Sequence, residues 1–487
     1  MQHDVIVIGA GIVGASCAYY LSKHQLSVLV LDKNSEAAFE ATKANSGIVH
    51  AGFDCKEGTL KAKLNVRGNQ LYRELAEELA IPLRLNGAYV LALDASDRPK
   101  LEELLARGVA NGVPNMQIIE RDALLTDEPN LNPDVHAALF APTSGITFGY
   151  EATVALAEVS ANNGVDYAFE QTVTGIEKTA VGYIVKTQTA TYTTRTIINA
   201  AGMYSDVINN YVNTKHYHVH PRKGEYLLLD TDAKYIVDKT IFQLPSKLGK
   251  GILVLPTIHD NILVGPSALD ITDKEDKSTH ADTLKNNVAV ARQSIPNLPM
   301  HMTITSFSGL RASLTDHDDF AVEATESPGF YNAVGINSPG LTAAPAIGEL
   351  IAQWVSDYLG ASPNTNWNGK RAGIVTLSTL DTKAQNELIA ENPAYGRIVC
   401  RCEMITEAEI VAAIQRTAGA RTTDGIKFRT RAMTGRCQGG FCTQKVLEIM
   451  AREMGKDVHE ITKFGAKSYV LAHDTNAGKE GCGCNNN

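Results

Sequence analysis

The chain has 487 residues, of which 44% are hydrophobic and 20% charged, so its length predicts two to three domains with sizeable hydrophobic cores. Its 45 lysines and arginines against 54 aspartates and glutamates give a formal net charge of -9. This acidic balance argues against a polyanion-binding protein, because phosphate backbones are bound by clustered basic side chains. We therefore expect no nucleic acid partner.

The N-terminal segment MQHDVIVIGAGIVG contains an apolar run that is too short for a signal sequence core or a membrane span. It also lacks a basic flank and a cleavage site, and no later segment approaches about twenty uninterrupted apolar residues. These features predict a cytoplasmic protein with no integral membrane segment. In that setting, close cysteine pairs indicate metal or redox chemistry more often than structural disulfides.

A dinucleotide-binding pattern opens the chain. Residues 4–8, DVIVI, are typical of a buried parallel strand, and ASCAYYLSK is typical of a helix. The turn between them contains three spaced glycines: Gly9, Gly11 and Gly14. They permit a tight turn, the approach of a pyrophosphate to the backbone, and close packing of helix on strand. A second strand, 28–31, ends at Asp32, where a carboxylate can bind ribose hydroxyls, so a dinucleotide cofactor is predicted.

The pattern alone fits both NAD and FAD, and the segment that follows distinguishes them by resemblance to a family. Residues 33–69 are rich in Ala, Ser, Gly and Asn and contain the stretches NSGIVHAG and GTLKAKLNVRGN. These stretches, and the sequence across most of the first 360 residues, resemble the FAD-dependent glycerol-3-phosphate oxidases and dehydrogenases of the D-amino acid oxidase superfamily. The resemblance implies an α/β fold in which a Rossmann-like FAD-binding domain is interleaved with an α+β substrate domain.

The same resemblance implies which residues bind the cofactor. Val173 would place its backbone against the adenine, and the strand ending at Gly202 would pass under the FAD. The residues implied to line the FAD are Thr42, Asn45, Ser46 and Gly47. A late helix would begin at Gly340, Leu341 and Thr342, with Ser338 near the substrate. Its positive end would stabilise the negative charge on the N1 and C2 carbonyl region of a reduced flavin.

His50 is the candidate catalytic base, because oxidation of a secondary alcohol needs a group that takes the hydroxyl proton. By resemblance it would face the substrate side of the flavin; the alternative is a loop histidine satisfied by the backbone. By the same resemblance, Lys250 would contact the substrate near the flavin, and Arg311, in its GLR context, would bind an anion. An arginine can bind a phosphate or carboxylate through two parallel hydrogen bonds, so a small anionic hydroxy substrate is expected. The alternatives are that Lys250 is a solvated lysine at a strand end and that Arg311 is a structural arginine at the surface.

Cys400 and Cys402 form a CxC pair, and Cys437 and Cys442 follow as CxxxxC. Four thiolates in two close pairs can hold a 2Fe-2S cluster, with two sulfurs on each iron; zinc is the competing metal. The segments CRCE and GRCQGGFC resemble the bacterioferritin-associated-ferredoxin-like domains of other flavin dehydrogenases. Cys482 and Cys484, near the end of the chain, are not expected to be ligands.

These patterns predict four parts of the chain. Residues 1–360 form the FAD-dependent oxidoreductase domain, with a substrate subdomain inserted at about 75–145 and 215–320. A linker over 361–394 and a small, mainly helical 2Fe-2S domain over 395–465 follow, and the last part, 466–487, is a flexible tail.

The predicted reaction is oxidation of sn-glycerol 3-phosphate to dihydroxyacetone phosphate with hydride transfer to FAD. Electrons would pass to the 2Fe-2S cluster and then to an unknown acceptor, which could be a protein, a quinone or oxygen. L-2-hydroxyglutarate is the alternative substrate, because that dehydrogenase family has a resembling SGIVHAG and LKAKL region. A further alternative is an electron-transfer subunit of a larger complex. The sequence leaves open a homo-oligomer or a partner subunit.

Overall fold

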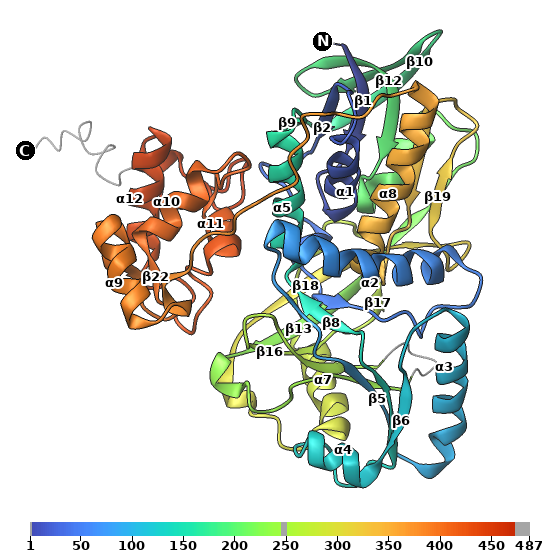
Figure 1. Ribbon diagram of the computed structural model, residues 1–487, viewed down its shortest axis with the longest axis vertical. Helices are drawn as coiled ribbons and strands as arrows, with labels where there is room; N and C mark the ends of the chain where they lie inside the picture. The colour runs from blue at the N-terminus through green and yellow to red at the C-terminus, as the bar shows by residue number, and fades with distance from the viewer. Residues whose placement is uncertain (1, 245–250, 473–487) are drawn as a thin grey trace, which may run out of the picture. The chain divides into compact units, whose positions relative to one another are not determined.

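The structure is a computed structural model that describes residues 2–244 and 251–472. The chain divides into two compact units, which we describe separately. One consists of residues 1–33 and 37–373, and the other of residues 34–36 and 374–487. The helices and strands of both units are labelled in Figure 1. None of the helices in the described ranges is long and apolar enough to cross a membrane.

A largely parallel sheet forms the core of the first unit (Figure 1). Its central strand β1 consists of the β-branched run that the sequence predicts, and it pairs in parallel with β2 and β12. The strand order is β10-β11-β12-β1-β2-β9, with β20 added to β12 and β19 added to β20. The bounds are β1 Gln2–Ile8, β2 Val28–Leu31, β9 Asp166–Ala168, β10 Val173–Thr179, β11 Gly182–Thr187, β12 Thr191–Asn199, β19 Ala321–Ala324 and β20 Phe330–Val334.

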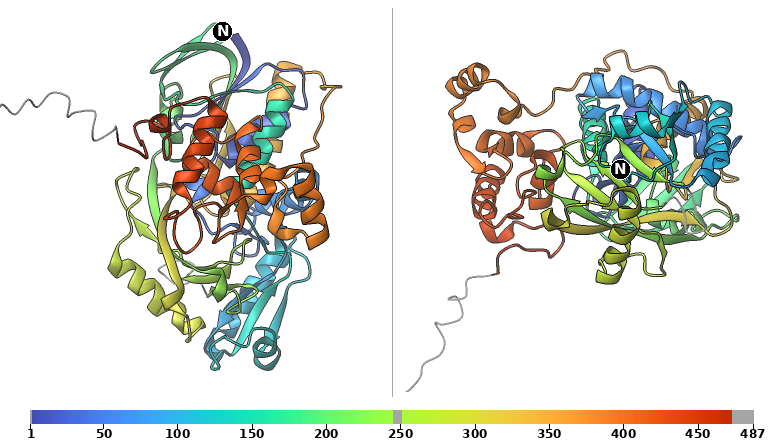
Figure 2. Two further views of the ribbon diagram at one scale, coloured as in Figure 1. Left: turned by 90° about the vertical axis from the view of Figure 1, so that its left-hand side faces the viewer. Right: turned by 90° about the horizontal axis from the view of Figure 1, so that it is seen from below.

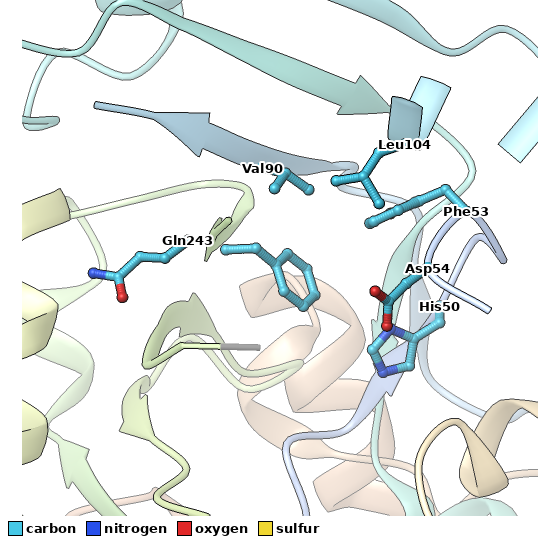
Figure 3. A pocket seen from close by; sticks show the side chains of 7 residues that line it. His50, Phe53, Asp54, Val90, Leu104 and Gln243 are labelled. Carbon is cyan, nitrogen blue, oxygen red and sulfur yellow. The ribbon is translucent and has the colours of Figure 1, made fainter. Parts of the chain in front are cut away.

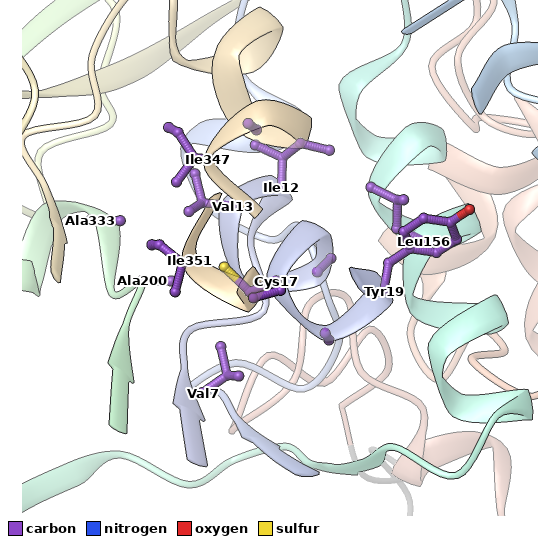
Figure 4. Close-up of a cluster of buried hydrophobic side chains, with 14 of the residues drawn as sticks. Val7, Ile12, Val13, Cys17, Tyr19, Leu156, Ala200, Ala333, Ile347 and Ile351 are labelled. Carbon is purple, nitrogen blue, oxygen red and sulfur yellow. The ribbon is translucent and has the colours of Figure 1, made fainter. Parts of the chain in front are cut away.

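Helices cover this sheet and bury its apolar side chains. α1 (Ile12–Leu21) packs between α5 (Gly149–Asn162) and α8 (Gly340–Leu359), and α2 (Leu60–Leu79) packs against α8. Figure 4 shows the result, a cluster in which Val7 of β1 meets Cys17 of α1 and Ile351 of α8. Because α8 begins at the site described below, this packing holds the site against the sheet.

A second, mostly antiparallel sheet has the order β17-β13-β16-β15-β14-β5-β7-β6, with β18 paired to β13. Its strands come from two separate parts of the chain, as an inserted subdomain requires. The bounds are β5 Ala88–Ala92, β6 Gln117–Glu120, β7 Ala137–Ala141, β13 Val219–Leu229, β14 Thr240–Gln243, β15 Leu253–Pro256, β16 Ile262–Gly265, β17 Leu269–Asp270 and β18 Thr303–Leu314. The helices that lie between its strands along the chain are α3 (Arg98–Ala110), α4 (Arg121–Asp127) and α7 (Ala281–Ser294).

Smaller elements connect the two sheets. β3 (Ile48–Val49), β4 (Leu83–Arg84) and β8 (Gly145–Thr147) form a three-stranded sheet, and α6 (Ser205–Asn210) follows β12. The predicted α/β architecture is therefore confirmed, with a Rossmann-like sheet and an interleaved α+β part.

The second unit is a small helical domain with its own core. Two short strands, β21 (Ile398–Cys400) and β22 (Ile405–Thr406), pair with each other. α10 (Glu407–Gln415) packs against both α11 (Thr423–Thr430) and α12 (Thr443–Met454), and α9 (Thr382–Glu391) precedes them in the chain. Figure 2 shows these helices in orange and red. Thr406 and Glu409 form a reciprocal capping box that defines where α10 begins. The core contains Ile410, Ile414, Ile426, Val446 and Met450.

Candidate active site and iron–sulfur site

The glycine-rich turn between β1 and α1 fits a dinucleotide. A Cβ atom on Gly9 would lie 2.3 Å from the Ala200 carbonyl oxygen, and one on Gly14 would lie 1.8 Å from the Gly9 carbonyl oxygen. Both glycines are therefore required by the packing of the chain itself. A Cβ on Gly11 would lie 3.3 Å from Thr42 Oγ1, and among the described residues beyond its chain neighbours it would meet no other atom within 4 Å. The fold leaves space at Gly11, as close approach of a pyrophosphate requires.

Asp32 and Thr42 border this turn. The Asp32 carboxylate accepts a hydrogen bond from the Ala10 amide at 2.7 Å, which places the acid beside the turn at the end of β2. Thr42 Oγ1 accepts from the amide of Ile12, the first residue of α1, at 3.2 Å. That amide belongs to the helix N-terminus, the part of a helix that favours an anion. The end of β2 and the segment at Thr42 are therefore both hydrogen-bonded to the turn and the start of α1.

The loop from Asn45 to Gly47 is held by its own side chains. The Asn45 amide donates to the carbonyl oxygens of Ala41 and Thr42 and accepts from the Gly47 amide at 2.8 Å. Asn45 therefore shapes the loop through its side chain. Ser46 Oγ lies 3.1 Å from the hydroxyl of Tyr226 on β13, which connects the loop to the second sheet.

His50 is fixed by its backbone. Its amide donates to Thr342 Oγ1 at 2.9 Å, and its carbonyl oxygen accepts from the side-chain amides of Asn65 and Asn69. Thr342 Oγ1 also donates to the Ile48 carbonyl oxygen at 3.2 Å. The hydroxyl of Thr342 thus connects the start of α8 to the His50 segment, a role that the sequence patterns did not indicate.

The His50 imidazole lies at a pocket with mainly apolar walls (Figure 3). Phe53, Val90, Leu104 and Phe242 line the pocket, and the Phe242 ring centroid is 6.0 Å from that of His50. Asp54 lines the same pocket and was not singled out from the sequence. Apolar walls limit access of water, which strengthens electrostatic interactions with the polar groups.

Arg311 lies on β18 in a face of the second sheet that approaches the Asn45 loop. A Cβ on Gly309 would lie 1.9 Å from the Ala44 carbonyl oxygen, so the strand and the loop are in close contact. The Arg311 guanidinium donates to the Ser267 carbonyl oxygen at 2.5 Å. Burial lowers the pKa of Arg311 below its ordinary value, and the neighbouring charge of Arg222 lowers it further. An anion bound here would compensate an otherwise costly buried charge.

Two side chains on the paired strand β13 were missed by the sequence analysis. Arg222 is directly opposite Arg311 in the strand register, and Tyr226 is opposite Phe307, with ring centroids 4.8 Å apart. Alternation along RKGEY places Arg222 and Tyr226 on one face, so period-two reading of this strand could have grouped them.

The remaining predicted cofactor residues are placed as follows. Val173 is the first residue of β10, and Gly202 follows β12 with a φ of +55. A Cβ on Gly202 would meet no described atom within 4 Å. Ser338 precedes α8, and the Leu341 carbonyl oxygen accepts from the Tyr72 hydroxyl at 3.0 Å. Lys250 lies outside the described residues.

The four predicted metal-ligand cysteines lie in the second unit as two pairs. Among the described residues, no three or more His, Cys, Asp or Glu side chains are grouped closely enough to hold a metal ion as they stand. Cys402 Sγ and Cys437 Sγ are 3.6 Å apart. Two thiolates on one tetrahedral metal, each at about 2.3 Å, would be about 3.8 Å apart. Burial raises the pKa of Cys442 to about 12, with a further contribution from the neighbouring Cys400 thiol. The thiols therefore associate across the two motifs, Cys402 with Cys437 and Cys400 with Cys442.

The backbone around these thiols suits an anionic cluster at the edge of the domain, where Cys400 and Cys442 are buried, Cys437 is half-buried and Cys402 is exposed. Burial by itself would raise the pKa of Cys437, but the Cys402 thiol and the backbone amides of residues 439–441 lower it overall. Amides that point at sulfur tune an iron–sulfur cluster. Four residues other than glycine have left-handed φ values in this region: Met404, Arg431, Met433 and Gln438. Such strained residues gather at ligand-binding sites. Cys482 and Cys484 lie outside the described residues.

Family models match both parts of the chain. The FAD dependent oxidoreductase family matches residues 4–354, and the BFD-like [2Fe-2S] binding domain matches residues 398–452. The second match decides between iron–sulfur and zinc for the cysteine site. Glycerol 3-phosphate dehydrogenase of Caloramator mitchellensis is 44% identical over 474 residues, which cover 97% of this chain and 98% of that protein.

Two further relatives match the first part of the chain. Glycerol 3-phosphate oxidase of Mycoplasma genitalium is 32% identical over 374 residues, covering 75% of this chain and 97% of the oxidase. The solved structure of dithionite-reduced L-alpha-glycerophosphate oxidase from Mycoplasma pneumoniae with FAD bound has a TM-score of 0.72 at 31% identity. It covers 76% of this chain and 98% of the oxidase. The chain therefore belongs to the FAD dependent oxidoreductase family, as an FAD enzyme that also carries a C-terminal BFD-like [2Fe-2S] domain.

Proposed function

We propose that this protein is a glycerol 3-phosphate dehydrogenase, which oxidises sn-glycerol 3-phosphate to dihydroxyacetone phosphate and passes the electrons through its 2Fe-2S cluster to an external acceptor. One observation carries the choice of dehydrogenase over oxidase. The oxidases match almost over their whole length but cover about three quarters of this chain, whereas the dehydrogenase also spans the cysteine-rich part. An added one-electron carrier is useful to an enzyme that delivers electrons to an acceptor other than oxygen.

The arginine pair supports a phosphate as the anion. Arg222 and Arg311 are directly opposite on neighbouring strands, and the Asp270 carboxylate lies 3.7 Å from the Arg222 guanidinium as its ion-pair partner. One carboxylate therefore faces two like charges, so a further anion would be favourable here. A phosphate dianion can accept hydrogen bonds from two guanidinium groups, whereas a single carboxylate carries half of that charge. We infer that the phosphate of the substrate binds to Arg311 with Arg222 beside it. Lys250 is proposed to orient the substrate.

His50 is proposed to take the proton of the C2 hydroxyl. A neutral imidazole is a suitable base near pH 7, and the backbone hydrogen bonds to Thr342, Asn65 and Asn69 hold it in place. FAD, when bound, supplies the hydride acceptor. Gly9, Gly11, Gly14, Asp32 and Thr42 would hold its adenosine and pyrophosphate side.

Anaerobic flavin bleaching tests this proposal. The purified protein, loaded with FAD and cluster, is mixed with glycerol 3-phosphate or with L-2-hydroxyglutarate, and flavin absorbance is followed. Rapid bleaching by glycerol 3-phosphate alone is expected. Bleaching by L-2-hydroxyglutarate alone would reassign the enzyme to 2-hydroxyacid oxidation, which the SGIVHAG and LKAKL stretches leave as the second candidate. Bleaching by dithionite alone would overturn both substrates and favour an electron-transfer subunit.

A further inference from the structure

Asp54 and His50 are the titratable side chains among the described residues that line the pocket. Figure 3 shows the Asp54 carboxylate pointing toward the His50 imidazole. The other wall residues are apolar apart from Gln243. α2 faces the His50 segment with the amides of Asn65 and Asn69, and α8 faces it with the hydroxyl of Thr342. Asp54 is thus the described anionic group at the imidazole, and Lys250 lies outside the described residues.

The backbone between the two residues is built to bring them together. Gly52 has a φ of +118, which only glycine adopts readily, and a Cβ there would lie 2.7 Å from Val66 Cγ2. The Asn111 side chain donates to the carbonyl oxygens of Gly52 and Cys55 at 3.0 and 2.8 Å. The Asn111 side chain therefore fixes the turn at Gly52. Because the chain reverses direction at this turn, residues 50 and 54 line the same pocket.

We propose that Asp54 is the positioning residue of the His50 base. Its carboxylate accepts a hydrogen bond from one ring N–H of His50, which leaves the other ring nitrogen as an acceptor directed at the substrate. When the C2 hydroxyl proton moves to His50 and the C2 hydride leaves for FAD, the carboxylate stabilises the resulting imidazolium. This inference rests on the proposed function, because it assigns a partner to the base of that reaction.

The first test measures the pH dependence of flavin reduction. Asp54→Asn keeps the size of the side chain and removes its charge, and Glu57→Gln, an exposed acid in the same loop, is the matched control. Anaerobic stopped-flow rates with glycerol 3-phosphate are recorded from about pH 5 to about pH 9. In D54N we expect a rate lower by about 10² or more and an acid limb moved down by about one pH unit. E57Q should match the wild type.

The second test does not depend on activity. Diethyl pyrocarbonate modifies neutral imidazole, so the extent of modification of the His50 peptide against pH, read by mass spectrometry, reports the His50 pKa. Its midpoint should be lower in D54N than in the wild type and E57Q. Asp54→Glu keeps the charge and should stay near the wild type.

The two tests separate the failure of this inference from the failure of the proposed function. If glycerol 3-phosphate does not bleach the wild-type flavin, the proposed function is wrong, while the modification experiment still tests the pairing. If the wild type is bleached and D54N has the same rate profile, or if all variants share one modification midpoint, Asp54 does not position His50. If a variant loses FAD, its flavin reduction rate cannot be used. The test is then whether the modification midpoint of D54N is lower than that of D54E.

Discussion

At the residue scale, the hydroxyl of Thr342 makes two hydrogen bonds that could not be predicted from its position at the start of a helix. It accepts from the His50 amide and donates to the Ile48 carbonyl oxygen, and its residue is fully buried. Loss of this hydroxyl would leave a buried donor and a buried acceptor without partners, and each such group costs about 1–3 kcal/mol. The position of the candidate base His50 therefore depends on a side chain from α8.

Thr342→Val should lower the thermal midpoint of unfolding and slow flavin reduction, because it keeps the shape of the side chain and removes the hydroxyl. Thr342→Ser, which keeps the hydroxyl, is the control and should retain most of the rate. Both are measured by thermal unfolding and by anaerobic flavin bleaching. Equal behaviour of the two variants would show that the hydrogen bonds of Thr342 are not what holds His50.

At the element scale, the three glycines of the turn between β1 and α1 differ in what surrounds them. Gly14 lies against the Gly9 carbonyl oxygen and so determines how closely the helix approaches the strand. The position of Gly11 has room for a methyl group, apart from a 3.3 Å approach to Thr42 Oγ1. A sequence pattern treats the three glycines alike, and their contacts differ because only some of them face protein.

Gly14→Ala should therefore destabilise the FAD-free protein by about 1–3 kcal/mol, since overpacking forces helix and strand apart. Gly11→Ala should leave the stability of the FAD-free protein nearly unchanged and weaken FAD binding about tenfold or more, which corresponds to about 1.4 kcal/mol. Denaturant unfolding of the FAD-free variants and FAD titration by fluorescence check the two outcomes. A Gly11→Ala protein that binds FAD normally would refute the assignment of this space to the pyrophosphate.

At the scale of the whole molecule, the two candidate sites lie in different units. The first contains the FAD fingerprint and the candidate base, and the second contains the four thiols with a hydrophobic core of their own. Substrate oxidation should therefore depend on the first unit, and delivery of electrons to an acceptor should depend on the second.

Cys437→Ser should remove the visible absorbance of the cluster and leave anaerobic bleaching of the flavin by glycerol 3-phosphate close to that of the wild type. Steady-state turnover with a one-electron acceptor should fall about tenfold or more, because the one-electron carrier is lost. Cys17→Ala, a buried cysteine of α1, is the control and should keep the cluster. Unchanged turnover in Cys437→Ser would mean that electrons leave directly from the flavin.

The sequence predicted the residues of the cysteine site more completely than those of the candidate active site, for a physical reason. The four thiols were found because metal ligands come in short, regular spacings, and the family comparison agrees with the cluster. Asp54, Arg222 and Tyr226 were missed, because an isolated acid, arginine or tyrosine in a chain of this length carries no spacing signal. Asp54 is identified by the pocket that it lines, and Arg222 and Tyr226 are identified by their register opposite β18.

The sequence by itself determined the class of cofactor, the α/β fold and the presence of a four-thiol site, since these follow from local rules of turn sterics, strand and helix periodicity and ligand spacing. Tertiary structure alone decided which distant segments meet. It placed Arg222 opposite Arg311 through strand register, joined Thr342 to His50, and associated the thiols across their two motifs. Such contacts depend on the packing of the whole unit, because no local preference specifies which strand or helix another will contact.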